Sequence, residues 1–228
     1  MIIRKSIQAI ASGCAHSIDL PKFKDLGMKN MRVVDSSIVS GPTLETKTIE
    51  EMKEIKSFGI DTIIDFRADG SSELQKKCLE AGINYERFPL DNVLTLDNPK
   101  YFSLTKDNKR QISDEFVEKL RNYFAKMNSQ QNLYVGCQYG IDRTNVGLTL
   151  NYLLNPKATN HNAPEILTWP GERKKTIINK LTKNIKKIFK SLTPEQKNKL
   201  GIDADDSNTI NTQIRKLLQK NHSIDINA

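Results

Sequence analysis

Residues 133–154 read LYVGCQYGIDRTNVGLTLNYLL and decide the fold class. A short apolar run, Leu133-Tyr134-Val135, is followed by a loop that contains a cysteine and a glycine, and an apolar stretch of helical length then begins at Val146. This order predicts a strand, a tight loop and a helix. Strands that alternate with helices along a chain are typical of α/β layer folds.

The loop carries two chemically active side chains, Cys137 and Arg143, with five residues between them. A loop that leads into a helix N-terminus presents unpaired N–H groups and the positive end of the helix dipole. Such a loop binds phosphate and favours the thiolate form of a cysteine placed within it. The planar guanidinium of Arg143 can hold two phosphate oxygens. The pattern therefore predicts a phosphatase with a cysteine nucleophile.

The alternative is a structural cysteine, because Cys is often a small buried hydrophobe. Gly140, where backbone must come close to an anion, and the hydroxyl of Thr144 favour the functional interpretation.

The same alternation of strands and helices extends upstream of the loop. Thr48 and Glu51 form a capping-box pattern at the start of one helix, and Ser71 or Ser72 and Ser113 or Asp114 are candidate caps of two more. We expect an α/β fold with a central, mostly parallel sheet flanked by helices, a C-terminal helical extension, and a ligand at the carboxyl ends of the strands. The predicted strands are 38–42, 60–66, 83–88 and 133–135, the predicted helices are 48–58, 71–81 and 113–127, and residues 89–112 are predicted to form a polar, irregular loop.

Three regions are expected: an N-terminal extension (1–30), a core (31–155) and a helical C-terminal part (156–228). Within the last, helix 172–190 holds eight basic residues and no acid between positions 173 and 190, whereas the other 27 basic residues are balanced by 27 acidic ones. Apolar residues at helical spacing indicate that one face packs on the core. The lysines then form either a solvated face or a contact with an anionic membrane surface. Nucleic acid is not expected, because aromatic residues are not interleaved with the basic ones.

The cysteines indicate a reducing compartment such as the cytoplasm. There are three of them, Cys14, Cys78 and Cys137, which is an odd number without metal-ligand spacing. We expect no metal and no cofactor. No apolar stretch approaches the roughly 20 residues of a membrane helix, and the apolar run near the start, broken by Gln8, does not resemble a signal peptide.

Cys137-x5-Arg143-Thr144 resembles the signature loop of the protein-tyrosine and dual-specificity phosphatase superfamily. The form with Gly140 and Asp142 is similar to that of bacterial phosphatases with broad specificity for phosphotyrosine and phosphoinositides, and also to that of myotubularin and Sac-type lipid phosphatases. Upstream, Ile38 to Gly41, and Ile63 to Arg67 followed by Glu73, are similar to the layout of the bacterial family. The sequence departs from these families at Gly136, where histidine is usual, and at Asn145, where the bacterial family usually has glycine.

The resemblance implies roles for the residues of the loop. Cys137 would form a cysteinyl-phosphate, Arg143 would clamp the phosphate, and Thr144 would hydrogen-bond the sulfur and help it leave. The implied phosphate-binding residues are Gln138, Tyr139, Gly140, Ile141, Asp142 and Arg143.

The general acid is either Asp91, which opens the long loop, or Asp142 within the signature loop itself, with Asp97 and Asp107 as further candidates. Arg67, at the end of a strand, is either a surface ion-pair partner or a residue that shapes the pocket.

The sequence leaves the substrate open. The loop contains no lysine, which favours a substrate with one phosphate, such as phosphotyrosine. The basic helix favours a phosphoinositide at a membrane. An inactive phosphate-binding module is the third alternative, and the sequence does not say whether the protein acts in its own cell or is delivered to another.

Overall fold

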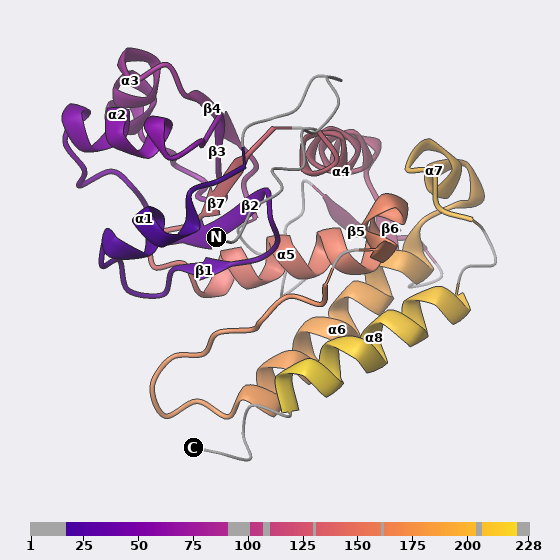
Figure 1. Cartoon of the computed structure of the whole chain (residues 1–228). Coiled ribbons are helices and arrows are strands. Elements are labelled where there is room, and N and C mark those ends of the chain that lie inside the picture. Colours follow the sequence, from indigo (N-terminus) through magenta and orange to yellow (C-terminus); the bar gives the residue numbers. More distant parts are fainter. Residues whose placement is uncertain are drawn as a thin grey trace, which may run out of the picture.

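A five-stranded sheet forms the centre of the molecule in a computed structural model that describes residues 17–90, 101–106, 110–129, 131–160, 162–203 and 207–222 (Figure 1). The strand order is β1-β2-β7-β3-β4, and β2, β7, β3 and β4 run parallel, with β1 antiparallel at one edge. The predicted fold class is therefore confirmed. The strands are β1 (Arg32–Val33), β2 (Ile38–Gly41), β3 (Thr62–Asp65), β4 (Asn84–Arg87) and β7 (Leu133–Gly136).

The register brings three strand ends together. Gly136 pairs with Gly41 on one side and with Asp65 on the other, so β2, β7 and β3 end at the same edge of the sheet. Ligands of parallel sheets bind at this carboxyl edge, and the residue that follows Gly136 is Cys137.

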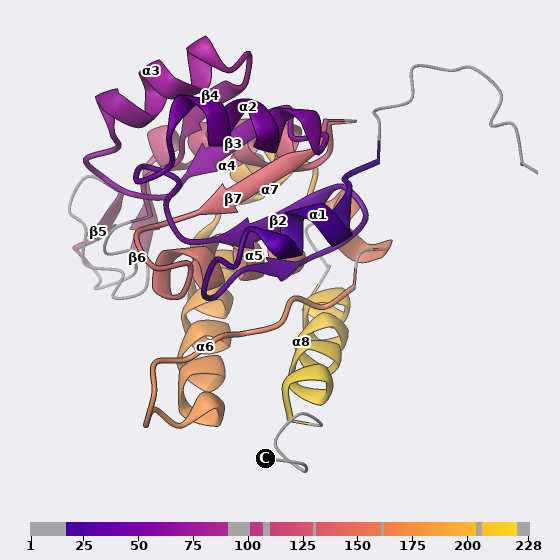
Figure 2. The same cartoon turned by 60° about the vertical axis from the view of Figure 1, so that its left-hand side comes forward.

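Helices cover both faces of the sheet because the strand residues alternate between two apolar cores. Ile38 belongs to the core under α4 and α5, whereas Val39 belongs to the core under α1, α2 and α3. Figure 2 shows α2 and α3 on one side of the sheet and α5 on the other. The helices are α1 (Leu20–Asp25), α2 (Ile49–Ser57), α3 (Ser72–Glu80), α4 (Asp114–Met127) and α5 (Asp142–Leu154).

The caps expected from the sequence set the helix starts. Thr48 and Glu51 make both hydrogen bonds of a capping box on α2. Of the alternative caps, Ser71 begins α3 and Ser113 begins α4. Each hydroxyl accepts a hydrogen bond from a backbone N–H that the helix itself leaves unpaired.

Residues 17–30, which the sequence assigns to an extension, pack onto the sheet. Phe23 of α1 is fully buried, with its ring 5.9 Å from that of Tyr134 on β7 and 6.3 Å from that of Phe58.

The C-terminal helices share the apolar core of α5. Leu181, Ile185 and Ile188 of α6 are buried there, as are Ile214 and Leu217 of α8. The predicted basic helix is therefore present and packs its apolar face on the core. No helix among the described residues is long and apolar enough to span a membrane. The C-terminal elements are the 3-10 helix η1 (Pro156–Asn160), α6 (Lys174–Ser191), α7 (Pro194–Lys199) and α8 (Ser207–His222).

The prediction of an irregular loop over 89–112 is wrong for its described second half. There β5 (Phe102–Leu104) and β6 (Arg110–Ile112) form an antiparallel ribbon. Aromatic packing of Tyr101 and Phe102 against Phe116 of α4 holds this ribbon on the core, so tertiary contacts outweigh the polar composition.

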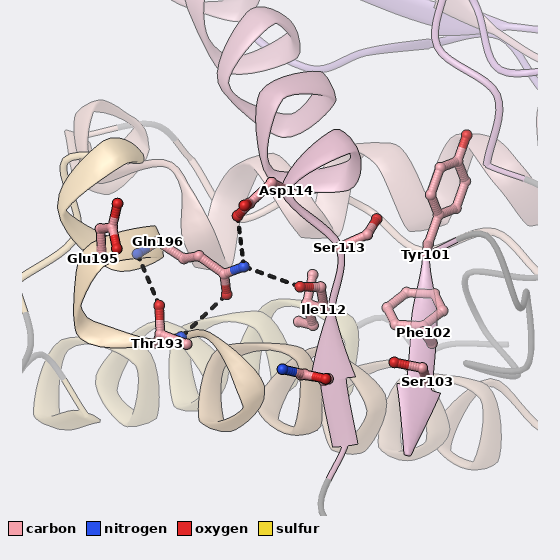
Figure 3. A pocket seen from close by; sticks show the side chains of 10 residues that line it. Tyr101, Phe102, Ser103, Ile112, Ser113, Asp114, Thr193, Glu195 and Gln196 are labelled. Atoms are coloured by element: carbon pink, nitrogen blue, oxygen red, sulfur yellow. Dashed lines mark hydrogen bonds between the residues drawn. The ribbon is translucent and has the colours of Figure 1, made fainter. Parts of the chain in front are cut away.

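A cavity of about 430 Å³ opens between the ribbon and the first turns of α4 and α7 (Figure 3). Gln196 of α7 closes part of it by donating to the carbonyl oxygen of Ile112 and to the carboxylate of Asp114. Its lining includes no residue between 137 and 143.

Candidate active site

The cysteine loop, residues 137–143, connects β7 to α5 and packs directly on the backbone at the end of β2. Gly140 has φ +73°, and a Cβ there would lie 2.5 Å from the carbonyl carbon of Gly41. Only glycine combines this left-handed backbone with so close an approach. The tight loop predicted from Gly140 is thus built against β2.

The same packing explains the glycine at position 136. A Cβ on Gly136 would lie 2.7 Å from the carbonyl oxygen of Gly41 and 3.3 Å from that of Pro42. Any side chain at this position, including the histidine usual in the superfamily, would push β2 away from β7. The departure from the usual pattern therefore follows from how closely these two strands meet.

Cys137 lies at the bottom of the loop with 3% of its surface exposed. Its Sγ accepts a hydrogen bond of 3.2 Å from the hydroxyl of Thr144, in the first turn of α5. Cys78, the other described cysteine, sits in the opposite core, where burial and then the charge of Asp65 raise the pKa of its thiol to about 12. Of the two thiols, only that of Cys137 faces a helix N-terminus, the environment that activates a cysteine.

Neighbouring elements brace the backbone of the cysteine loop. The amide of Asn30 donates to the carbonyl oxygen of Tyr139 at 3.0 Å, and the N–H of Thr43 donates to that of Gln138 at 3.4 Å. Asn30 lies in the segment that the sequence treats as an extension, and nothing in the local pattern marks it as part of the site.

Arg67 is buried and connects β3 to the cysteine loop, so its interpretation as a surface ion-pair partner is wrong. Its guanidinium donates to both Asp65 oxygens, at 2.7 to 3.0 Å, to Glu45 at 2.6 Å and to the side-chain oxygen of Gln138 at 3.3 Å. Burial opposes its charge, but hydrogen bonds to the two carboxylates outweigh burial and raise the pKa of Arg67. Arg67 thus shapes the loop through Gln138.

The structure describes one of the two candidate general acids, Asp142. Asp91 lies outside the described residues, as do Asp97 and Asp107. Asp142 is exposed at the first position of α5, and the indole N–H of Trp169 donates to its two carboxylate oxygens at 3.1 and 3.2 Å. Arg143 is half-buried in the same helical turn. Cys137 and Thr144 are therefore in contact, and Asp142 and Arg143 precede Thr144 in the first turn of α5.

Sequence reasoning missed Arg32, a buried arginine of β1 beneath α5. Its Nη2 donates to the Asn145 side chain at 2.8 Å, while Nε and Nη1 have no hydrogen-bond partner among the described residues. Burial lowers the pKa of Arg32 to about 10, against the opposing influence of negative charge on Glu165 and Cys137. The one local signal for Arg32 is that a charged residue stands between two apolar ones, Met31 and Val33.

Register explains where Arg32 points. It pairs with Ser40 of β2 across the antiparallel edge, and directly opposed residues share a face of the sheet. Ser40 and Ile38, two residues apart, lie on the face that α5 covers. The positive charge of Arg32 is thus held under the first turns of α5, on the side of the sheet to which Cys137 belongs.

Comparison with known families gives one match, and it covers this site. The sequence model described as the tyrosine phosphatase family matches residues 23–155, more than half of the chain. The chain belongs to this family. It is accordingly a cysteine-based phosphatase, and the matched range contains the whole cysteine loop. No match was found among curated proteins.

Several solved structures are similar to this chain. A phosphatase of the DUF442 type from Shewanella putrefaciens CN-32 has 17% identity and a TM-score of 0.46, with 71% of this chain and 95% of that chain covered. PTPMT1 has 12% identity and a TM-score of 0.37, with 83% and 97% covered. The catalytic domain of the PP-IP phosphatase Siw14 from S. cerevisiae has 13% identity and a TM-score of 0.39, with 83% and 95% covered.

Proposed function

We propose that the protein hydrolyses phosphotyrosine, or phosphotyrosine together with phosphoserine and phosphothreonine, in protein substrates through a cysteinyl-phosphate intermediate. The observation that carries this proposal is the position of the Cys137 sulfur, 3.2 Å from the Thr144 hydroxyl at the N-terminus of α5. A thiol in this position has the helix dipole and backbone N–H groups to stabilise its anion and to hold a phosphate beside it.

In the first step the Cys137 thiolate attacks phosphorus, a sulfur–phosphorus bond forms, and the bond to the leaving oxygen breaks. Backbone N–H groups of residues 138–143 and the guanidinium of Arg143 hold the non-bridging oxygens, over which the transition-state charge is spread. The general acid, Asp142 or Asp91, gives its proton to the leaving oxygen.

In the second step water attacks phosphorus, the sulfur–phosphorus bond breaks and inorganic phosphate leaves. The electron pair of that bond returns to the Cys137 sulfur. The Thr144 hydroxyl, already directed at Sγ, stabilises this developing thiolate.

A phosphoinositide is the second candidate substrate, and a specific surface favours it. A groove of about 610 Å³ runs between residues 166–168 and the start of α6, where Arg173, Lys174 and Lys175 line it. Basic residues near an anionic membrane each contribute about 1 kcal/mol to binding. The basic face of α6 would hold the protein at such a surface.

The test measures phosphate release by the wild type, Cys137→Ser and Cys78→Ser without added metal, from a phosphotyrosine peptide and a panel of phosphoinositides. We expect the first substitution to abolish turnover and the second to retain it, because Cys78 lies in the opposite core. Higher kcat/KM on the peptide supports the first candidate, and higher kcat/KM on a phosphoinositide supports the second. A folded wild type that releases phosphate from none of these substrates rejects both.

A further inference from the structure

The basic groove lies between two pieces of chain outside residues 23–155, the range that matches the family. One wall is formed by residues 166–168, which belong to the segment between η1 and α6 that is drawn in orange in Figure 1. The other wall is formed by residues 172–175 at the start of α6. The volume of about 610 Å³ is within the range of clefts that bind ligands.

Buried side-chain amides hold the first wall in place. Asn145 of α5 donates to the Leu167 carbonyl at 2.6 Å and accepts from the Leu167 N–H at 3.2 Å. The N–H of Ile166 donates to the side-chain oxygen of Asn221, on α8, at 2.8 Å. Because two helices fix the backbone of this wall, the groove is preformed, and a ligand does not have to order it.

The groove is positively charged. Arg173, Lys174 and Lys175 line it, and Glu172 is the one acid among its lining residues. Within the described part of the chain, none of these three cations has an acidic side chain at ion-pair distance. Arg173 and Lys175 are exposed. Three neighbouring cations without a partner repel one another, and an anionic ligand relieves this repulsion.

A tight turn connects the groove to the cysteine loop. The N–H of Glu172 donates to the Trp169 carbonyl at 3.1 Å, and Gly171 between them has φ +83°, as in a type II turn. The indole N–H of Trp169 donates to Asp142, and its ring lies 5.1 Å from that of Tyr139. The ends of such a turn are less than about 7 Å apart, so the groove begins roughly 12 Å from the Tyr139 ring, the length of about four residues of extended peptide.

Two observations favour a peptide over a membrane as the occupant of the groove. The first is that α6 buries its apolar face in the core, whereas a helix that lies on a bilayer inserts this face into the lipid. Among the described residues, the large apolar side chains that are exposed all lie outside α6 and α8; they are Val33, Leu79, Leu104 and Tyr139. The second is the concave shape, which admits an extended chain.

We propose that the groove is a subsite for acidic residues that lie about four positions from the phosphorylated residue of a protein substrate. The inference rests on the first candidate of the proposed function, a phosphorylated protein. The phosphate occupies the cysteine loop while carboxylates of the same chain face Arg173, Lys174 and Lys175. Each exposed ion pair contributes about 1.4- to 5-fold, so three pairs give a preference of roughly 3- to 100-fold.

The test compares two phosphotyrosine peptides. The acidic peptide carries glutamate at the third to fifth positions on both sides of the phosphotyrosine, and the neutral peptide carries glutamine there. The wild type should have a roughly 3- to 100-fold higher kcat/KM on the acidic peptide, chiefly through a lower KM, and added salt should reduce this ratio. In the groove variant, which combines Arg173→Gln, Lys174→Gln and Lys175→Gln, the ratio should fall to about one.

A control variant removes the same charge from the far end of α6. It combines Lys183→Gln, Lys187→Gln and Lys190→Gln, which are exposed positions at least about 12 Å further along the helix, beyond the Debye length of about 8 Å. The control variant should keep the preference of the wild type. Glutamine has nearly the helix propensity of lysine and arginine, and circular dichroism checks that α6 is intact in both variants.

Reversal of the charge separates recognition from a structural effect. A variant that combines Arg173→Glu, Lys174→Glu and Lys175→Glu should prefer a third peptide, with lysine at the same positions, over the acidic one. A groove that only supports the fold cannot produce this exchange of preference.

The groove proposal and the proposed function fail in different ways. An active wild type with equal kcat/KM on the acidic and neutral peptides overturns the groove proposal alone, as does an equal loss of preference in the groove and control variants. Co-sedimentation with phosphatidylcholine vesicles that contain 20% phosphatidylserine tests the membrane. Loss of vesicle binding in the groove variant with an unchanged peptide ratio assigns the groove to lipid and overturns the subsite. A folded wild type that hydrolyses none of the peptides overturns the protein phosphatase function and the subsite with it.

Discussion

Replacing Arg32 by methionine should make the protein more stable and less active. Arg32 is charged at pH 7 although 93% of its surface is buried, and burial lowers its pKa to about 10. One pKa unit corresponds to about 1.4 kcal/mol, so keeping this charge in the folded state costs on the order of 3 kcal/mol. Methionine fills a similar volume without the charge.

Part of this gain is offset by lost contacts. The hydrogen bond from Arg32 to Asn145 contributes about 1 kcal/mol, and Asn145 retains its two bonds to the backbone of Leu167. A net stabilisation of about 2 kcal/mol remains, which corresponds to a rise of about 4–8 °C in Tm for a chain of this size. The substitution also removes a positive charge that interacts with Cys137, so it should slow the reactions of this sulfur.

Two assays check this prediction. Urea unfolding gives the free energy of unfolding, and the rate of alkylation by iodoacetamide at pH 7 gives the reactivity of the Cys137 sulfur. Cys14→Ser and Cys78→Ser in all proteins leave Cys137 as the sole thiol of the chain, and Arg32→Lys keeps the charge as a matched control. A methionine variant destabilised by more than 1 kcal/mol, or one with an unchanged alkylation rate, would refute the reasoning.

Three further outcomes are expected. Thr144→Val should slow breakdown of the cysteinyl-phosphate by roughly 10- to 100-fold, because a hydrogen bond to a charged sulfur contributes about 1.5–3 kcal/mol. Rapid-quench measurements should then show phosphorylated Cys137 accumulating. An unchanged burst of the leaving group would contradict a role of Thr144 in this step. Gly140→Ala should cost about 1–3 kcal/mol of stability, because position 140 has a positive φ and the added Cβ would meet the Gly41 carbonyl. The same variant should bind tungstate more weakly. Calorimetry measures both the stability and the tungstate affinity. Hydrogen bonds lower the pKa of Glu45, so its stabilising effect is present above about pH 4.5 and is lost as pH falls through the folded value. The urea midpoint of Glu45→Gln should therefore depend less on pH between about 5 and 3 than that of the wild type, and parallel curves would exclude this role.

Elements whose signals are local were predictable from the sequence. The capping box at Thr48 needs only Glu51, three residues away, and the strand at 62–65 follows from its run of apolar and β-branched residues. The shape of the cysteine loop is likewise set by nearby residues. The loop contains Gly140 and lies between the end of a strand and the start of a helix, all within a dozen residues. The ribbon of β5 and β6 was not predictable, since Phe116 of α4 supplies the packing that holds it.

The sequence by itself predicted the α/β class, and it indicated the candidate nucleophile and the candidate arginine clamp, because each depends on residues close together in the chain. Only the tertiary structure decided what surrounds them. Arg32 and Asn145 are 113 residues apart, and Trp169 is 27 residues from Asp142. The spacing of apolar residues shows which face of an element is apolar. The register of an edge strand, and the path of residues 162–173 between η1 and α6, depend instead on how these faces pack. The buried charge beneath α5 and the contact between Trp169 and Asp142 are therefore properties of the folded chain.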